Sequence, residues 1–337
     1  MCDNSVEGYE IIQQIRHNTT TSLNIKLKDI SNEAAKAIAA ELKINLALKS
    51  LSITWSLSNE GVKAIVETLK VNSTLTRLNI ANGIGEESAK AIAEALKINS
   101  TLTRLDIESQ NILKEGAKAL AKALKINSTL TTLNIAFNNI SVEGAEAISE
   151  ALKINSTLTT LSIAGNTIWE KPAKVIAEAL KINSTLTSLD IASNGISEEG
   201  AKAIGEALKI NSTLTTLNIA SNDISEEGAE AIAAALKINS TLTSLDMSRS
   251  FISEEGAKAV AEGLKMNYTL TSLAIGIHTI PKEVVQAVEE ALKINTTLRS
   301  LSIETYSSGL SDEFAALEQM FTMNVRLTTT YVRHVTP

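Results

Sequence analysis

The stretch LTTLNIASNDISEEG, residues 214–228, recurs with small changes along the whole 337-residue chain. Its second leucine returns after 27 or 28 residues, at Leu23, Leu51, Leu78, Leu105, Leu133, Leu161, Leu189, Leu217, Leu245, Leu273 and Leu301. A weaker twelfth copy, residues 327–332, follows after a spacing of 29. Self-similarity at a fixed period of this length is typical of an array of stacked repeats rather than of separate globular domains.

Each repeat has the pattern of a strand, a loop, a helix and a turn. Leu217 and Ile219 alternate with polar residues, which predicts a short strand with both apolar side chains on its buried side. Ser225 is expected to cap the helix that follows, because a serine oxygen accepts a backbone N–H left free at a helix start. Two glutamates come next, where negative charge suits the helix dipole. Asn239 then ends the helix, since asparagine tolerates the left-handed conformation found there.

One strand and one helix cannot bury their apolar faces alone, so the copies are expected to stack. The predicted fold class is an α/β solenoid, or horseshoe, of about 12 repeats of 27–29 residues. A parallel sheet is expected on its concave face and helices on its convex face. The whole chain, residues 1–337, is interpreted as one domain. Within it we expect a half-repeat helix cap over 1–19, repeats over 20–310 and an atypical C-terminal cap over 311–337.

The residues of one repeat follow the order Leu-x-x-Leu-x-Ile-x-x-Asn-x-Ile, then Ser-Glu-Glu-Gly-Ala and an alanine-rich helix ending in Ala-Leu-Lys. This pattern resembles the ribonuclease-inhibitor-like subclass of leucine-rich repeats. That subclass includes ribonuclease inhibitor, Ran GTPase-activating protein and the sensor arrays of NOD-like receptors. The resemblance covers essentially the whole chain and implies the solenoid fold. It implies less about function, because a fold does not decide a function.

The composition argues against several functional classes. The formal net charge is −7, whereas a nucleic-acid groove needs a clustered basic surface, so no nucleic-acid partner is expected. The three histidines and the single cysteine, Cys2, show no spacing typical of a metal site or a catalytic pair. The sequence has no phosphate-binding glycine loop. We therefore expect a protein that is not an enzyme, with no cofactor, no metal and no evident small-molecule substrate.

The N-terminal residues lack the basic start and apolar run of a secretion signal, and no stretch approaches about 20 apolar residues. A cytoplasmic location without a membrane partner is therefore expected, or the cytosol of a host cell if the protein is a secreted effector. The glycosylation motif Asn-x-Ser/Thr nevertheless occurs in many repeats, as at Asn99 and Asn127. Each copy falls where a helix turns into the next strand, so a structural role in that turn is favoured over glycosylation.

A first group of candidate partner-binding residues lies near the N-terminus. Arg77 and Arg104 fall at the same outward-facing strand position of neighbouring repeats, Asp106 and Glu108 stand beside them, and Trp55 follows the second strand. Tryptophan and arginine are enriched among the residues that dominate protein interfaces. The alternative is an ordinary solvated face whose charges neutralise one another, with Trp55 filling a gap left by a shortened repeat.

A second group lies near the C-terminus, in loops after successive strands and on the last strand: Arg249, Phe251, Ile277, His278, Tyr306, Tyr331 and Arg333. In the central repeats the loop carries an asparagine, as at Asn222, that is expected to satisfy buried backbone groups. Ser250, His278 and Tyr306 replace that asparagine, so we expect these loops to be rebuilt. The alternative is sequence drift beside the end of the array, where repeats are normally atypical.

Small polar residues occupy the outward-facing strand positions of the central repeats, which favours binding near the two ends. The first hypothesis is a non-enzymatic protein-interaction module, acting as a scaffold, inhibitor or effector. It would bind an unidentified protein partner through the concave face or the rim of ascending loops. The resemblance supplies two alternatives. One is a GTPase-activating protein similar to Ran GTPase-activating protein, and the other is a fragment similar to an innate immune sensor.

Overall fold

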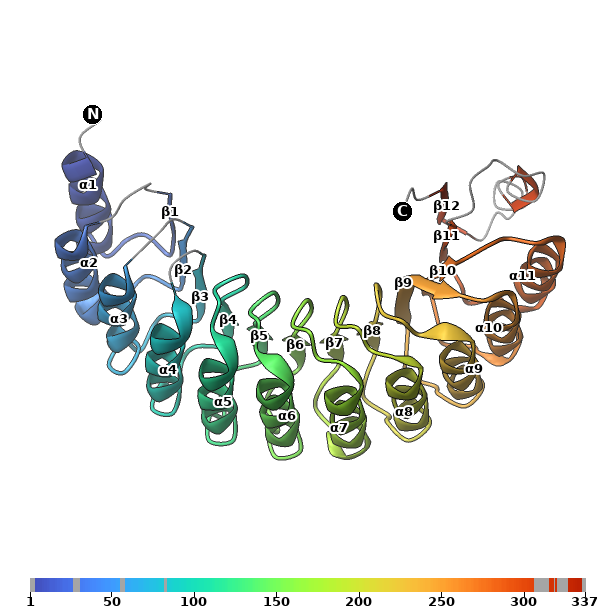
Figure 1. Ribbon diagram of the computed structural model, residues 1–337. Coiled ribbons are helices and arrows are strands. Elements are labelled where there is room, and N and C mark those ends of the chain that lie inside the picture. The colour runs from blue at the N-terminus through green and yellow to red at the C-terminus, as the bar shows by residue number, and fades with distance from the viewer. Residues whose placement is uncertain are drawn as a thin grey trace. The chain divides into compact units, whose positions relative to one another are not determined.

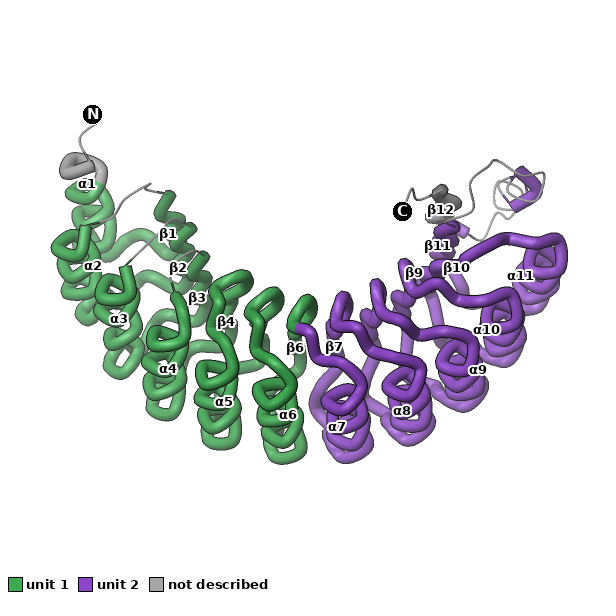
Figure 2. The backbone as a smooth tube through the Cα atoms, in the orientation of Figure 1, with its two compact units in different colours: residues 1–166 green, residues 167–337 purple. Residues whose placement is uncertain are grey.

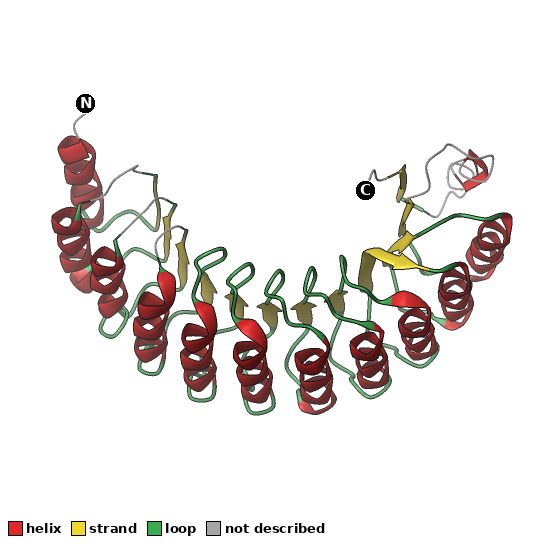
Figure 3. Ribbon diagram, in the orientation of Figure 1, coloured by secondary structure: helices red, strands yellow, loops and turns green. Residues whose placement is uncertain are grey.

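The computed structural model describes residues 4–26, 31–54, 58–81, 84–305, 315–317, 319 and 327–334. Helices and strands alternate along the chain and are joined by loops (Figure 1, Figure 3). Contacts divide the chain into two compact units, residues 1–166 and 167–337 (Figure 2). Each unit has its own set of strands and helices.

In unit 1 the strands line the inner side and the helices the outer side (Figure 1). The helices are α1 (Asn4–Arg16), α2 (Asn32–Ile44), α3 (Asn59–Thr68), α4 (Gly85–Leu96), α5 (Leu113–Leu124) and α6 (Ser141–Leu152). The strands are β1 (Ser22–Ile25), β2 (Ser50–Ile53), β3 (Arg77–Ile80), β4 (Arg104–Asp106), β5 (Thr132–Asn134) and β6 (Thr160–Ser162).

Unit 2 has the same two layers. Its helices are α7 (Glu170–Ile182), α8 (Glu198–Leu208), α9 (Ser225–Leu236), α10 (Glu254–Met266) and α11 (Lys282–Ile294). Its strands are β7 (Ser188–Asp190), β8 (Thr216–Asn218), β9 (Ser244–Ile252), β10 (Ser272–Ile277), β11 (Ser300–Thr305) and β12 (Thr329–His334). The strands lengthen from three residues in β7 and β8 to nine in β9.

Within each unit the strands pair in parallel and in chain order, with the repeat leucines opposite one another. Leu51 lies opposite Leu78 in unit 1, and Leu245 lies opposite Leu273 in unit 2. Thr330 takes the leucine's place in β12, as the spacing of 29 predicts. The expected fold class, an α/β repeat solenoid with a parallel sheet backed by helices, is therefore confirmed.

Leucine, isoleucine and alanine fill the space between strands and helices. Leu133 of β5 and Ala117 of α5 are each 0% exposed. A Cβ added at Gly116 would lie 2.9 Å from the Cβ of Ala89 on α4, so α5 could not pack as closely with a larger residue there. The glycine that recurs near the helix start therefore sets the spacing between neighbouring helices.

A ladder of buried side-chain amides satisfies the backbone of the loops after the central strands. The Nδ2 of Asn166 donates to three backbone carbonyls, at 2.9, 3.0 and 3.1 Å, and its Oδ1 accepts the backbone N–H of Asn138 at 2.8 Å. The ladder is at most 4% exposed and comprises Gln110, Asn138 and Asn166 in unit 1, and Asn194 and Asn222 in unit 2. The predicted role of the loop asparagine is confirmed, because buried backbone groups need such partners.

The expectation that Ser225 caps its helix through its side chain is wrong. Ser225 has a φ of 58°, and the N-cap position of α9 is Ile224. The Ser225 hydroxyl instead donates to Oε2 of Glu198, at the start of the preceding helix, at 2.8 Å. Serine caps in the expected way only with an extended backbone, where its oxygen accepts the N–H three residues on, as it does at Ser31, Ser58 and Ser253.

The turn from each helix to the next strand is built on a buried asparagine. The left-handed conformation expected for it is wrong, since Asn183 and Asn267 end their helices in an extended conformation, with φ of −68° and −91°. The Nδ2 of Asn127 donates to the backbone oxygen of Leu96 at 2.8 Å, and its Oδ1 accepts the backbone N–H of Leu130 at 2.7 Å. Asn127 is 7% exposed, and Asn99 is buried in the same way. These amides are engaged inside the protein, which supports the structural reading of the Asn-x-Ser/Thr motifs over glycosylation.

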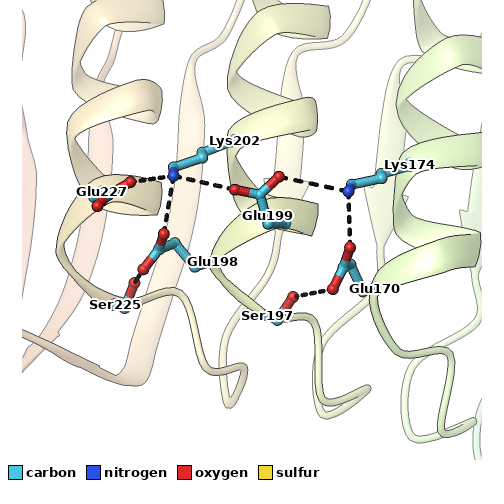
Figure 4. Close-up of polar contacts among 8 residues, drawn as sticks. All are labelled: Glu170, Lys174, Ser197, Glu198, Glu199, Lys202, Ser225 and Glu227. Carbon is cyan, nitrogen blue, oxygen red and sulfur yellow. Dashed lines mark hydrogen bonds and ion pairs between the residues drawn. The ribbon is translucent and has the colours of Figure 1, made fainter.

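Ion pairs link three helices on the outer side of unit 2 (Figure 4). Lys202 of α8 contacts Glu198 and Glu199 at 2.9 and 3.2 Å, and also Glu227 of α9. Lys174 of α7 reaches Glu199 at 3.5 Å. Hydrogen bonds donated by Lys202 lower the pKa of both Glu198 and Glu199, and those it donates to Glu227 and Glu198 raise its own pKa. Exposed ion pairs contribute little one by one, so helix packing remains the main source of stability.

Candidate functional site

The N-terminal candidates lie on the outward-facing side of β3 and β4 in unit 1. Arg77 opens β3, Arg104 opens β4, and the two are register partners in the parallel sheet. Neighbouring strands are about 4.8 Å apart, so the two side chains leave the sheet side by side. Both arginines are exposed because the next residues, Leu78 and Leu105, point into the core.

A hollow of about 420 Å³ lies on this face of the sheet. Its volume falls within the range of about 300–1,000 Å³ typical of ligand sites. Most of its lining side chains are polar and come from β2 to β5: Ser50, Ser52, Arg77, Asn79, Arg104, Asp106 and Thr132. The sheet thus presents a pre-formed polar depression centred on the two arginines.

Opposite charges border the arginine pair. A guanidinium nitrogen of Arg104 lies 4.0 Å from Oδ2 of Asp106, at the limit of an ion pair. The Nδ2 of Asn134 donates to Oδ1 of Asp106 at 3.1 Å and to Oε2 of Glu108 at 3.0 Å, which holds the two carboxylates together. Among the described residues, no carboxylate lies within ion-pair distance of Arg77. The site therefore has a cationic side and an acidic flank.

The structure brings together four of the five N-terminal candidates, and Trp55 lies outside the described residues. Sequence reasoning missed Ser52, Asn79 and Thr132, because small polar residues at outward-facing positions carry no signal by themselves. The strand register would have found them, since it places them on the same face as the arginines.

The C-terminal candidates lie mostly in lengthened strands, and the prediction that they lie in loops needs correction. Arg249 and Phe251 belong to β9, and Ile277 ends β10. Ile277 is 0% exposed, so its place as an accessible partner-binding residue is wrong, and it packs in the core instead. It pairs in register with Ile252 across the extended strands. Where Ser250 replaces the asparagine, the loop is rebuilt, as expected, and the rebuilt form is sheet, while the loop at Tyr306 lies outside the described residues.

A second polar group forms on the extended strands of unit 2. The Nε of Arg249 lies 3.7 Å from Oε2 of Glu304, a residue only 8% exposed. Gly276 allows this approach, because a Cβ at that position would lie 2.3 Å from the backbone nitrogen of Arg249. Phe251 is 52% exposed and His278 is also exposed, so these side chains remain accessible.

The remaining C-terminal candidates are less completely placed. Tyr306 lies outside the described residues. Tyr331 and Arg333 belong to β12, where their backbones pair with Ser302 and Glu304 of β11, but their side chains are outside the described part. The expected clustering of this group along one rim stays a prediction.

Within the part of the chain that the structure describes, no helix is long and apolar enough to cross a membrane. No group of three or more histidine, cysteine, aspartate or glutamate side chains in the same part of the chain could hold a metal ion.

Five segments of the chain match the family model described as leucine-rich repeat: residues 99–121, 127–149, 183–205, 211–233 and 239–261. The chain therefore contains leucine-rich repeats, while its assignment to the ribonuclease-inhibitor-like subclass stays a prediction. A search of curated proteins found no match.

Solved structures provide further comparisons. Actin-binding site 2 of leiomodin-1 is 27% identical, with 44% of this chain and 86% of that chain covered and a TM-score of 0.38. The tropomodulin C-terminal domain of Caenorhabditis elegans is 18% identical, with 45% and 92% covered and a TM-score of 0.40. A chain of the yeast Rad7 and Elc1 complex is 16% identical, with 96% and 83% covered and a TM-score of 0.50. This last likeness extends along almost the whole chain and supports the fold.

Proposed function

We propose that this protein is a non-enzymatic interaction module that binds a protein partner on the strand face of unit 1. The observation that carries the proposal is the hollow of about 420 Å³ around Arg77 and Arg104. Arginine is among the residue types that dominate protein interfaces, and such residues act most strongly inside a depression that a partner can fill. A repeat array presents this surface with the same backbone conformation before and after binding. Less conformational entropy is therefore lost when the partner binds.

The strand face of unit 2 differs in composition at its first two strands. Ser188, Asp190, Thr216 and Asn218 occupy the outward-facing positions of β7 and β8, where unit 1 has its arginines. These short side chains offer no large anchor for a partner. Unit 2 also has exposed candidates, Arg249 and Phe251 of β9, but we assign partner recognition to unit 1 because its two arginines line a hollow. No described feature favours GTPase activation or immune sensing over this general role, and neither is proposed.

The proposal is tested by reversing the charge of the hollow. The variant R77E/R104E is compared with the wild type in affinity capture from cell lysate, with the retained proteins identified by mass spectrometry. The control K36E/K43E changes net charge equally at two exposed lysines of α2, which lie on the helical side of unit 1. We expect a partner that the wild type and K36E/K43E retain and that R77E/R104E loses.

Two results would contradict the proposal. One is a specific partner that R77E/R104E retains as well as the wild type, which would place binding elsewhere. The other is a folded wild-type protein that retains nothing specific from several lysates. Circular dichroism of each variant shows that a loss of binding does not reflect a loss of fold.

A further inference from the structure

Arg77 and Arg104 together place a positive charge on two adjacent strands, and we call this pair of side chains the anion seat. Each guanidinium has five N–H donors in a planar fork that matches the two oxygens of a carboxylate. Arg77 has no carboxylate partner among the described residues, and Arg104 has one only at 4.0 Å. Because the side chains start from register-paired positions on adjacent strands, both can turn toward one bound group.

Neutral donors complete the lining of the hollow. Ser50, Ser52, Asn79 and Thr132 line it, and within the described part of the chain their side chains form no hydrogen bond to protein. By contrast, the hydroxyl of Thr103 is already engaged, since it donates to the backbone oxygen of Thr76 at 3.0 Å. The free hydroxyls and the amide can therefore serve a ligand that accepts hydrogen bonds.

The charge balance of the hollow distinguishes among anions. Arg77 and Arg104 carry two positive charges, and Asp106 carries one negative charge, so the lining is left with a net charge of +1. A carboxylate, with one negative charge, balances that surplus. A phosphate monoester carries about −1.5 to −2 at neutral pH and exceeds it. Glu108 lies outside the lining, but Asn134 holds its carboxylate beside Asp106, so it repels any bound anion and repels a doubly charged one more strongly.

We infer that the hollow seats a single carboxylate, presented by an aspartate or glutamate side chain of a partner segment that is only locally acidic. This inference rests on the proposed function, because the segment belongs to the protein partner. The hollow of about 420 Å³ has room for the acidic side chain and for part of its flanking residues. The guanidinium of Arg77, which forms no ion pair with the described residues, binds the carboxylate, and Arg104 is shared between the ligand and Asp106.

The test is a titration followed by NMR of the arginine Nε–Hε groups, of which the chain has seven. The probe is the tripeptide acetyl-Ser-Glu-Ser-amide, and the matched control is acetyl-Ser-Gln-Ser-amide. Spectra of the variants R77Q and R104Q assign the two signals. We expect both signals to shift saturably with the same Kd on addition of the glutamate peptide, while the signal of Arg299 in unit 2 stays in place. R77Q should weaken binding by about tenfold.

A third peptide, with phosphoserine in place of glutamate, distinguishes the two anions. Tighter binding of phosphoserine than of glutamate would overturn the assignment to a carboxylate. The absence of a saturable shift, or an equal shift with the glutamine peptide, would overturn the anion seat itself. Neither result decides the proposed function, since partner capture by the wild type and its loss in R77E/R104E are measured separately. A retained partner in R77E/R104E together with a normal peptide titration would leave the seat intact and contradict the proposed function.

Discussion

In two parts of unit 2, the buried backbone N–H and C=O groups after the strand find hydrogen-bond partners in different ways. After β7 and β8 the chain turns in loops whose buried backbone is paired by Asn194 and Asn222. In the next repeat the chain continues as β9 up to Ile252, and Ser250 occupies the asparagine's place, fully buried. The Ser250 hydroxyl donates to the backbone oxygen of Ser248 at 3.1 Å, and beyond a register shift Ile277 of β10 pairs with Ile252 at the end of β9.

In these neighbouring repeats, a different residue at one fixed position accompanies a different exposed surface. Buried backbone groups must be paired, and either a side-chain amide or a neighbouring strand can pair them. With the amide, the strand stays three residues long and the loop turns away. In the repeat that has Ser250 instead, the strand extends and carries Arg249 and Phe251 with it, whereas β1, β2 and β3, whose repeats also lack the amide, are four residues long. The replacement of a buried asparagine by Ser250 is thus accompanied by a different set of exposed side chains.

The largest expected effect comes from removing an amide of the ladder. In Asn222→Ala, three carbonyls lose Nδ2 donors at 2.9, 3.2 and 3.2 Å, and the N–H groups of Asn194 and Ile196 lose an acceptor. A buried group left unpaired costs about 1–3 kcal/mol, but relaxation of the loop and entering water restore some of the five lost bonds, so a total loss of about 3–5 kcal/mol is expected. Urea unfolding measures the loss, and hydrogen exchange should be fastest at the amides of Asn194 and Ile196.

Asn218→Ala is the matched control for that variant. Asn218 lies in the same repeat, and its Oδ1 accepts the backbone N–H of Ala220 at 3.1 Å, at a partly buried site. Its removal should cost about 1 kcal/mol or less. If the two alanine variants lost equal stability, the ladder would not be the element that holds these loops.

A smaller effect is expected where sheet pairing replaces the ladder. In Gly276→Ala the added Cβ would lie 2.3 Å from the backbone nitrogen of Arg249, which cannot move without disturbing β9. We expect a loss of about 2 kcal/mol, measured by urea unfolding. Gly8→Ala on α1 is the control. Its Cβ would meet only the Cβ of Ala34, at 3.8 Å, and alanine favours a helix, so no loss is expected there. Equal stability of Gly276→Ala and wild type would show that the strands do not approach closely.

The smallest effect is the pH dependence of the outer ion pairs. Lys202→Gln removes contacts that join α8 to α9, whereas Lys293→Gln removes one pair within α11, to Glu289 at 2.8 Å. The folded pKa values of Glu198 and Glu199 are lowered, so their contribution to stability is present above about pH 4.5 and is lost as the pH falls through the lowered pKa values. We expect Lys202→Gln to lower Tm more than Lys293→Gln at pH 7. Thermal unfolding from pH 7 to pH 3 should show the difference shrinking below pH 4.5, and a difference independent of pH would contradict the network.

The period alone predicts most of the fold, because the repeat leucines become register partners strand after strand. The role of Asn222 could also be predicted, because a polar side chain at a buried position needs hydrogen-bond partners on the backbone. Gln110 was missed, although it stands in the same column and donates to the backbone oxygen of Glu108 at 2.6 Å. The extent of β9 could not be predicted either, since Ser250 shows that the amide is missing but not what replaces it.

The candidate site was predictable as far as side-chain type allows. Arg77 and Arg104 stand out from the small residues around them, and the fixed strand spacing makes them neighbours. The hollow around the two arginines depends on the directions of the lining side chains, which the sequence pattern does not specify. Ile277 was misplaced because a strand lengthened by the missing amide turns a predicted loop residue into core.

The buried asparagine of each turn gives the array a direction. Asn239 bonds to the backbone oxygens of Leu208 and Asn211, which both belong to the preceding repeat, and Asn127 depends in the same way on Leu96. The amide donors of a turn are therefore satisfied only when the repeat before it is folded. The backbone oxygen of the same asparagine accepts from the next repeat, as that of Asn127 does from Asn155 at 3.3 Å. The two ends of a partly folded array therefore leave different groups unpaired, side-chain amide donors at the N-terminal end and backbone oxygens at the C-terminal end.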